Sequence, residues 1–233
     1  MAVRVGTSGY SYTAWKGSFF PADLPSSRML EFYAQKLSTV EINNTFYRMP
    51  TSAALAHWAE QVPEGFVFTL KAPRRITHQK QLADCADETS HFLRLASELG
   101  AKLGPLLFQL PPFMKKDLTR LRDFLASLPK SFASAFEFRH DSWIDDQVFE
   151  ALREKNAALC IADTDEKEGQ VIRTANWGYL RLRRSDYPAA SLASWAKRIP
   201  GEWARAYVYF KHEEEGKGPK FAMDFEAAVN QAR

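Results

Sequence analysis

Cysteine is scarce in this chain, and extended apolar stretches are missing from it. Of the 233 residues only Cys85 and Cys160 are cysteines, and their separation suits neither a metal-binding pair nor a disulfide framework. We therefore expect a protein of a reducing compartment, most simply the cytoplasm. No run of about 18 apolar residues occurs, and no charged segment followed by an apolar one opens the chain, which argues against membrane insertion and secretion.

Charge of one sign is not in large excess either. The 31 basic and 28 acidic residues give a formal net charge of +3, which is too balanced to require nucleic acid and leaves anionic ligands open. No low-complexity segment or linker interrupts the sequence, so we expect one domain over residues 1–233. The oligomeric state does not follow from these totals.

Several motifs of nucleotide, metal and hydrolase chemistry are also missing. There is no dinucleotide-binding fingerprint, no phosphate-binding loop that ends in Gly-Lys-Ser/Thr, and no Ser-His-Asp motif. The five histidines show no His-x-His or His-Glu-x-x-His spacing, so we expect neither a zinc cluster nor a cofactor. A lone Mg²⁺ held by Glu137 and Asp163 is the metal site that the sequence leaves open.

What is present is a set of eight short apolar segments that recur about every 30 residues, the spacing of a (β/α)₈ barrel. Segments with apolar residues at helical spacing lie between most of them, and this alternation is typical of parallel βαβ units. The sequence therefore predicts a single α/β domain with the TIM-barrel fold. Residues 165–176 lack a helical period, so we expect a short or irregular crossover between the sixth and seventh strands. The predicted strands are residues 3–7, 39–43, 66–71, 106–110, 134–139, 157–163, 179–183 and 206–211.

Polar and apolar residues alternate within several of these strands. Residues 179–183 place leucines on one face and arginines on the other, and residues 135–139 separate phenylalanines from Glu137 and Arg139 in the same way. We expect the apolar faces to pack against the helices and the polar faces to point into the barrel. The polar groups gather toward the C-terminal strand ends, where barrel enzymes keep their active sites.

The ionic residues of these strands carry a net charge of +2, which favours a small anionic ligand such as a phosphate or a carboxylate. A structural network of salt bridges inside the barrel is the alternative interpretation, because buried charges need partners. Asn43 and Gln109 share the polar face and are further candidates for ligand binding. The ionic set consists of Lys71, Arg139, Arg181, Arg183, Lys211, Glu41, Glu137 and Asp163.

The loop after the first predicted strand adds hydroxyl groups, backbone amides and aromatic rings. Thr7 and Ser8 lie between two glycines, which allow a ligand to approach the backbone closely. Tyr10 and Trp143, with Tyr12 and other rings of the first loop, are candidates for stacking on a sugar or a base. Packing of the same rings over the top of the barrel is an equally good interpretation.

Three residues are candidates for catalysis. Glu41 and Glu137 are expected at the same end of the barrel, where two carboxyl groups in unequal surroundings serve as acid and base, as in glycoside hydrolysis. Lys71 is a candidate Schiff-base nucleophile if burial and neighbouring cations lower its pKa. A plain contact between Lys71 and an anion is the alternative.

Six segments are informative when taken together: residues 6–10, 40–48, 68–71, 76–78, 106–112 and 136–140, followed by Trp143. They resemble the YecE-like family, domain-of-unknown-function family 72. The resemblance implies a TIM barrel and no established reaction. It implies an Asn-rich stretch after the last strand, but residues 211–216 read Lys-His-Glu-Glu-Glu-Gly, so no role is carried over to that loop. The family's recurrent polar positions map to Glu41, Asn43, Lys71, Gln109, Glu137, Arg139 and Arg181.

Two classes of function fit these residues. The first is a hydrolase or isomerase that acts on a small anionic substrate, such as a phosphorylated sugar or a sugar acid. The second is a nucleic-acid-binding barrel, with a DNA-repair-type nuclease as one form, and a ligand-binding barrel without catalysis is a third possibility. His78 is counted with the rim cations that support the second class, which are Arg74, Arg75, Arg139, Arg183 and Arg184.

Overall fold

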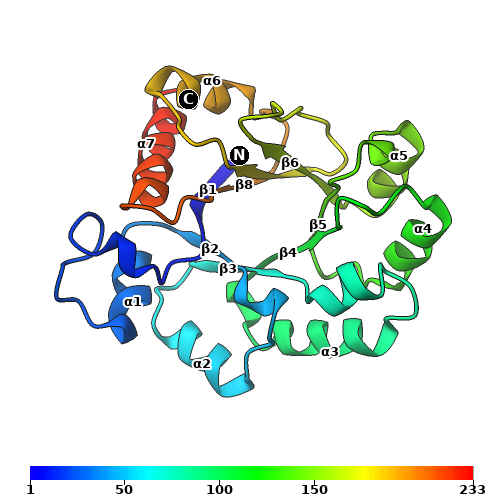
Figure 1. Ribbon diagram of the computed structural model, residues 1–233, viewed down its shortest axis with the longest axis horizontal. Helices are drawn as coiled ribbons and strands as arrows, with labels where there is room; N and C mark the ends of the chain where they lie inside the picture. Colours follow the sequence, from blue (N-terminus) through cyan, green and yellow to red (C-terminus); the bar gives the residue numbers. More distant parts are fainter. Residues whose placement is uncertain (233) are drawn as a thin grey trace.

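Eight parallel strands close into a barrel in the computed structural model, which describes residues 1–232 (Figure 1). Each strand pairs with the next along the chain, and the first pairs with the last, so no sheet edge is left open. The predicted TIM-barrel fold is confirmed. The strands are β1 (Ala2–Ser8), β2 (Thr39–Ile42), β3 (Val67–Lys71), β4 (Leu103–Gln109), β5 (Ser134–Glu137), β6 (Ala158–Asp163), β7 (Trp177–Leu182) and β8 (Arg205–Phe210).

The helices form an outer ring around the strands (Figure 1). One α-helix follows each strand of the described chain except β6, and the segment from residue 164 to residue 176 connects β6 to β7 without a helix. The predicted irregular crossover is therefore confirmed. The helices are α1 (Met29–Ala34), α2 (Ser52–Glu60), α3 (Ala86–Ser97), α4 (Leu118–Ser127), α5 (Asp146–Glu154), α6 (Ala189–Arg198) and α7 (Lys217–Gln231).

The β6–β7 connection is held against the barrel by hydrogen bonds at both of its ends. The backbone N–H of Gly169 donates to Asp163 Oδ1 over 3.0 Å, and the backbone N–H of Leu159 donates to Thr174 Oγ1 over 2.7 Å. Hydrogen bonds to side-chain acceptors thus fix this connection in place, whereas a helix does so after the other strands. The connection lies along the outside of the wall, in the gap between α5 and α6 (Figure 1).

Five strands, β2, β4, β5, β7 and β8, end one or two residues earlier than the sequence pattern predicts. Strand β5 ends at Glu137 and β8 at Phe210, so Arg139 and Lys211 lie in loops above the barrel. For β5 the reason is visible in its pairing with β6, which is limited to Ala135 with Ala158 and Phe136 with Leu159. Above these pairs the two strands separate.

The predicted alternation of side chains produces two packing layers. Leucines and phenylalanines point outward against the helices, whereas tyrosines fill much of the barrel interior. The hydroxyl group of the fully buried Tyr209 lies 2.9 Å from Thr39 Oγ1 and 2.7 Å from Thr69 Oγ1. The ring of Tyr179 lies 5.3 Å from that of Tyr209. The middle of the barrel is therefore closed by rings whose hydroxyl groups are hydrogen-bonded.

Gly178 in β7 offers a test of the outer packing. A Cβ atom at this position would lie 2.1 Å from the ring of Trp203, so Gly178→Ala forces the indole to move. We expect a loss of about 1–3 kcal/mol in the free energy of unfolding, measured by urea denaturation. Gly201→Ala is the matched control, because nothing lies within 4 Å of its Cβ position. A loss at Gly178 no larger than that at Gly201 would contradict this packing.

Candidate functional site

The C-terminal half of the barrel interior is lined by polar side chains from six strands. Parallel pairing places Ser8 beside Glu41 and Gln109 beside Glu137, and the period of two along each strand turns these side chains inward. Lys71 ends β3 at the same level, and Arg181 comes from the far side of the barrel. We call this set the polar layer: Ser8, Glu41, Lys71, Gln109, Glu137 and Arg181.

Arg181 is the centre of the polar layer. Its side chain is 2% exposed, and it bridges two carboxylates that are themselves almost inaccessible to solvent. The N–H groups donate to Glu41 Oε1 over 2.8 Å and to Glu137 Oε2 over 2.6 Å. A delocalised guanidinium is suited to this role, because it can donate to two acceptors in fixed directions.

Glu41 has a hydrogen-bond donor at each oxygen. Ser8 Oγ and Asn43 Nδ2 donate to Oε1 over 2.7 Å and 3.1 Å, and the Tyr179 hydroxyl donates to Oε2. Burial alone would raise the pKa of this carboxyl, but Arg181, Tyr179 and Ser8 outweigh it and lower the pKa below the ordinary value. Glu41 is therefore ionised near neutral pH.

Glu137 is ionised for the same reason. Burial opposes its charge, but Arg181 and Arg183 outweigh the burial and bring its pKa to about 2. Arg183 reaches Glu137 Oε1 over 3.2 Å. The two carboxyl groups thus have similar surroundings, and the prediction that one of them holds a proton is wrong. Neither is placed to act as a general acid.

Lys71 is the cation of the polar layer that gives up its proton most readily. Its Nζ donates to Gln109 Oε1 over 2.8 Å and lies 4.2 Å from the centre of the Phe46 ring. Burial and the charge of Arg181 lower its pKa from 10.5 to about 8, and Lys211 acts in the same direction. A substantial fraction of the amine is therefore neutral at slightly alkaline pH, as a base or a nucleophile requires.

The pKa of Lys71 predicts its chemical reactivity. Because only the neutral amine is acylated, labelling of Lys71 by acetic anhydride is expected to rise with a midpoint near pH 8, against 10.5 for an ordinary lysine. Mass spectrometry of the peptide that contains Lys71 measures the labelled fraction at each pH. A midpoint close to 10.5 would show that burial and Arg181 do not act on this amine as described.

His78 lies beside Lys71 and is uncharged. It belongs to a single π-helical turn (Arg75–Gln79), and its ring packs edge-on against Phe46 with 4.8 Å between the ring centres. Burial, followed by the charges of Lys71 and Arg139, lowers its pKa to about 4. The sequence-based count of His78 as a rim cation is therefore wrong at neutral pH.

A chamber of about 590 Å³ lies among the loops that follow β5, β6, β7 and β8, and its walls include Arg139, Arg183 and Lys211. Arg183 pairs with Glu137, but its Nε is buried and has no hydrogen-bond partner among residues 1–232. Within the same described part of the chain, no carboxylate lies within ion-pair distance of Arg139 or Lys211. Acidic residues of the loops, among them Glu166 and Glu213, also line the chamber wall.

Some predicted binding residues do not face this chamber. Asp163 points outward, where it is fully buried and bound to Arg184, Tyr187 and the backbone of Gly169. It is therefore not a ligand of an Mg²⁺ shared with Glu137. Thr7 also points outward and is hydrogen-bonded to Tyr33 by both its backbone and its hydroxyl group. Because residues next to each other in a strand alternate sides, Thr7 and Ser8 cannot both line the barrel.

The predicted stacking platform is not formed by the aromatic rings that suggested it. Trp143 is completely buried, its ring stacks on Phe138 at 4.6 Å, and its Nε1 donates to the Met114 carbonyl. Tyr10 packs against the core, with its ring 6.2 Å from that of Tyr33. The packing interpretation therefore holds for both rings.

Three residues of the site were not identified from the sequence. Tyr179 is in phase with Arg181 along β7, so the period of two was a usable signal for it. Phe46 follows β2 in a short 3₁₀ turn, Asn44–Phe46, and its only signal was its place in residues 40–48, the segment that resembles the family. Glu213 acts on Tyr12: burial and then the charge of Glu213 raise the pKa of Tyr12 to about 12. The loop after β8 thus reaches the mouth of the barrel.

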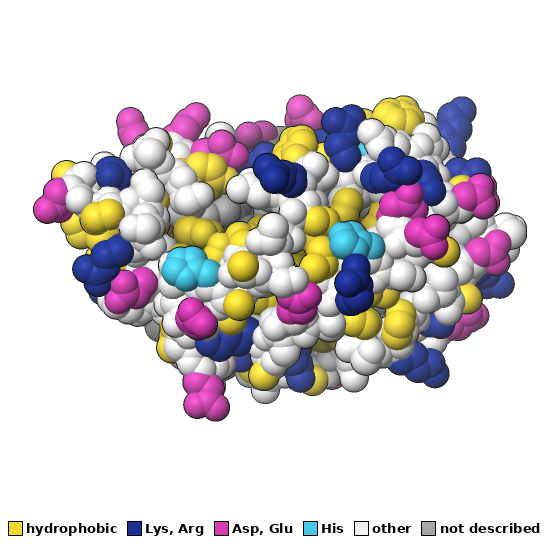
Figure 2. Space-filling model, turned by 90° about the horizontal axis from the view of Figure 1, so that it is seen from below, with side chains coloured by type: hydrophobic (Ala, Val, Ile, Leu, Met, Phe, Trp, Pro, Cys, Tyr) yellow, Lys and Arg dark blue, Asp and Glu magenta, His cyan; other side chains and the backbone are white. Residues whose placement is uncertain are grey.

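The cations that suggested nucleic-acid binding are largely neutralised. Arg75 pairs with Glu88 over 2.6 Å, Arg183 with Glu137, and Arg184 with Asp163 over 2.8 Å. Figure 2 shows Lys and Arg side chains interspersed with Asp and Glu on the face that it displays. This face is the side of the barrel that lies at the bottom of Figure 1, near α1, α2 and α3.

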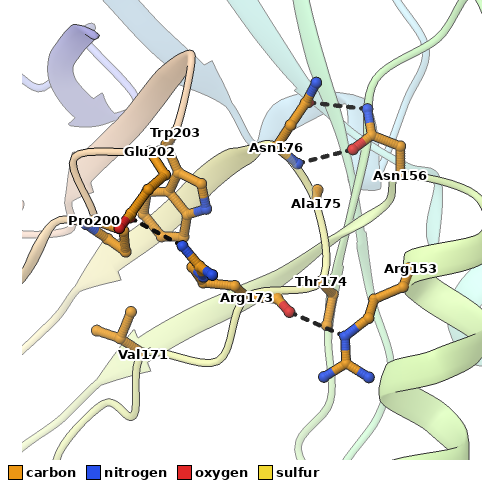
Figure 3. Close-up of a pocket in the computed structure, with 10 residues that line it drawn as sticks. All are labelled: Arg153, Asn156, Val171, Arg173, Thr174, Ala175, Asn176, Pro200, Glu202 and Trp203. Atoms are coloured by element: carbon orange, nitrogen blue, oxygen red, sulfur yellow. Dashed lines mark hydrogen bonds and ion pairs between the residues drawn. The ribbon is translucent and has the colours of Figure 1, made fainter.

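A second pocket, of about 890 Å³, lies at the opposite end of the barrel (Figure 3). Its polar residues are bound to one another: Arg173 pairs with Glu202 over 2.9 Å, and Asn156 donates to Asn176 over 3.0 Å. Residues at the N-terminal ends of barrel strands usually serve stability, and these contacts tie neighbouring connections together. We therefore place the candidate site at the other end.

Metal clusters and membrane-spanning helices are both missing from residues 1–232. No group of three or more His, Cys, Asp or Glu side chains in this range is arranged to hold a metal ion. None of the helices described is long and apolar enough to cross a membrane.

Comparison with known proteins shows the family of this chain. YecE of Escherichia coli K12 is 38% identical over 112 residues, which are 48% of this chain and 41% of YecE, so the match spans less than half of that relative. A DUF72 family protein from Thermotoga maritima superposes with a TM-score of 0.85 at 25% identity, covering 99% of this chain and all of that one. A second, from Enterococcus faecalis, gives 0.79 at 20% identity and covers 98% and 95% of the two chains.

A methyltransferase from Methanosarcina mazei shares the fold alone, with a TM-score of 0.53 and 11% identity over 98% of this chain and 94% of that one. The family model described as "Protein of unknown function DUF72" matches residues 4–233, which is nearly the whole sequence. The chain therefore belongs to the DUF72 family.

Proposed function

We propose that this protein is an enzyme of the isomerase type that moves a proton on a small anionic substrate such as a phosphorylated sugar or a sugar acid. The observation that carries the proposal is Lys71, an amine with a pKa of about 8 held at the mouth of a TIM barrel. Its Nζ donates one hydrogen bond to Gln109, so the neutral form keeps a lone pair for the substrate.

The fixed charges around Lys71 support this chemistry better than hydrolysis of a glycoside. That reaction requires one carboxylic acid that holds its proton, whereas Glu41 and Glu137 are both ionised. Instead, Arg181 holds the two carboxylates in place, and Arg183 supplies the second positive charge that balances them. In this proposal Glu41 and Glu137 position Arg181, and Lys71 exchanges the proton.

The chamber cations support an anionic substrate. Arg139, Arg183 and Lys211 line the chamber, Lys211 is close enough to Lys71 to lower its pKa, and guanidinium groups bind phosphate or carboxylate oxygens in a fixed geometry. An anion held there would leave the rest of a small molecule over the polar layer. The two buried, unpaired cysteines support a cytoplasmic location, which we include in the proposal.

Deuterium exchange tests this function even though the substrate has not been identified. The protein is incubated in D₂O with a panel of sugar phosphates and sugar acids, and NMR follows the loss of proton signals next to carbonyl groups. We expect exchange in at least one compound and its loss in Lys71→Met. Parallel incubation with borohydride distinguishes proton transfer from a Schiff base, which would be trapped as a secondary amine on Lys71.

Two results would count against the proposal. The first is exchange that persists at the original rate in Lys71→Met. The second is the absence of exchange together with DNA binding that weakens steeply with salt, which would instead favour a nucleic-acid-binding barrel.

A further inference from the structure

The barrel wall has an opening beside the candidate site. Strand β5 pairs with β6 only through Ala135 and Phe136, whereas β6 remains paired with β7 as far as Asp163. Above Leu159 the two strands therefore separate on the β5 side. Because no helix follows β6, the opening is backed only by the irregular connection from residue 164 to residue 176 (Figure 1).

A pocket of about 590 Å³ passes through this opening, and we call it the lateral pocket. Its lining includes Glu137 and Cys160, which belong to the barrel interior, and Ile161 and Ile172, which pack in the outer layer. A cavity lined from both layers crosses the wall. It thus connects the interior of the barrel with the outside.

The outer part of the lateral pocket is apolar. Its lining includes Phe138, Ile144, Leu159, Ile161 and Ile172. Ile144 is 48% exposed and is one of the few large apolar side chains of the described chain that are left in solvent. An exposed isoleucine beside a hydrophobic cavity is explained if an apolar group covers it when the cavity is filled.

Charges at the outer rim of the lateral pocket are mostly paired within the protein. Asp141 binds Lys167 over 2.6 Å, and Glu168 binds Arg198 over 2.5 Å. These pairs connect the β6–β7 connection to its neighbours on either side. The rim therefore offers little free charge to a ligand. We expect the apolar side chains of the lateral pocket to determine which chains it accepts.

The lateral pocket and the chamber meet at two cations. Arg139 and Arg183 line both spaces, so a ligand bound by these guanidinium groups has access to the chamber on one side and to the apolar surface on the other. The buried Nε of Arg183 still has no acceptor within residues 1–232. An oxyanion at this junction would supply one.

We infer that the ligand of this site is an anion with an apolar chain, a phosphate or carboxylate whose charged group binds Arg139 and Arg183 while its chain lies in the lateral pocket. The inference rests on the proposed function, because it assigns the substrate class of the same site, and it narrows the small anionic substrates considered there to those with an apolar chain in place of a sugar. It adds the requirement that affinity depends on the length of the chain. Binding of an anion by Arg139 and Arg183 alone, which we call the anion seat, has no such requirement.

Isothermal titration with inorganic phosphate and with ethyl, butyl and hexyl phosphate tests this assignment. Each methylene that enters the lateral pocket is expected to raise affinity about three- to fourfold. Propyl phosphate compared with glycerol 3-phosphate controls for length, since the polar chain should gain far less. In Ile144→Asp the gain with length is expected to disappear while inorganic phosphate binds as before.

Met223→Asp is the matched control for the Ile144 variant, because Met223 is 38% exposed on α7 and does not line the pocket. It should retain the full dependence on chain length. Affinity that is equal across the series, or that Ile144→Asp leaves unchanged, overturns the inference while the anion seat stands. Failure of every member to bind overturns the inference and the seat together, and the deuterium-exchange assay then still tests Lys71 by itself.

Discussion

Replacing Arg181 by methionine is expected to lower the free energy of unfolding by about 3–5 kcal/mol, because two buried carboxylates lose the cation that they share. Glu41 and Glu137 are 0% and 1% exposed, so water cannot take the place of the guanidinium. Arg183 reaches Glu137 alone, and Glu41 would keep only neutral donors apart from the more distant Lys71. Urea denaturation at neutral pH measures the loss.

The dependence on pH identifies the cause of that loss. In the native protein the pKa of both carboxyl groups is lowered, so they contribute stability above their unfolded pKa of 4.5 and lose it as the pH falls through the folded values. Without Arg181, burial is expected to raise the pKa of both carboxyl groups, and protonation at lower pH then removes the cost of burying their charge. The difference in free energy of unfolding between the native protein and the variant should therefore narrow between pH 7 and pH 4.

The double variant Arg181→Met and Glu137→Gln is the control for charge, because it removes one of the two buried carboxylates that lose Arg181. Part of the lost stability should return in this double variant. A loss below about 1 kcal/mol, or one that does not change with pH, would mean that Arg181 does not hold the carboxylates as the geometry indicates.

Replacing Lys71 by methionine is expected to lower the rate of proton transfer by about 10²–10⁴-fold, the usual contribution of a general base. Methionine retains most of the contact with Phe46 but has no proton to exchange. In the native protein kcat/KM should rise with pH as the amine loses its proton near pH 8. Circular dichroism and urea denaturation verify that the variant is folded.

Lys71→Arg separates the two roles that remain for this side chain. Arginine keeps the positive charge but does not lose its proton at accessible pH. If Lys71 is a base or a nucleophile, the arginine variant should be as inactive as the methionine variant. Activity retained in Lys71→Arg would show that Lys71 contributes a simple contact with an anion.

The fold could be predicted from the sequence because each part of a βαβ unit leaves a local signal. Apolar segments at regular spacing predicted the eight strands, and the lack of a helical period after residue 163 predicted the irregular connection. Strand ends were less accurate, because they depend on where neighbouring strands separate. The position of Arg139 above the barrel follows from the separation of β5 and β6.

The site was predicted only as far as the alternation of side chains extends. Glu41, Lys71, Gln109, Glu137 and Arg181 lie together as expected, because each alternates along its strand with apolar residues that face the helices. Which of them pair could not be predicted, since the contacts depend on the register of distant strands. The bridging by Arg181 decided that both carboxyl groups are ionised, and no local pattern encodes such a bridge.

The ring of hydroxyl groups formed by Tyr209, Thr39 and Thr69, with the ring of Tyr179 packed beside it, acts as a floor beneath the charged residues. The tyrosines that form this floor are fully buried. Solvent and ligand therefore approach the charged residues from the upper end or through the lateral pocket. A proton that Lys71 gives up leaves along the routes by which the ligand enters, and the packed rings below serve as the support of the site.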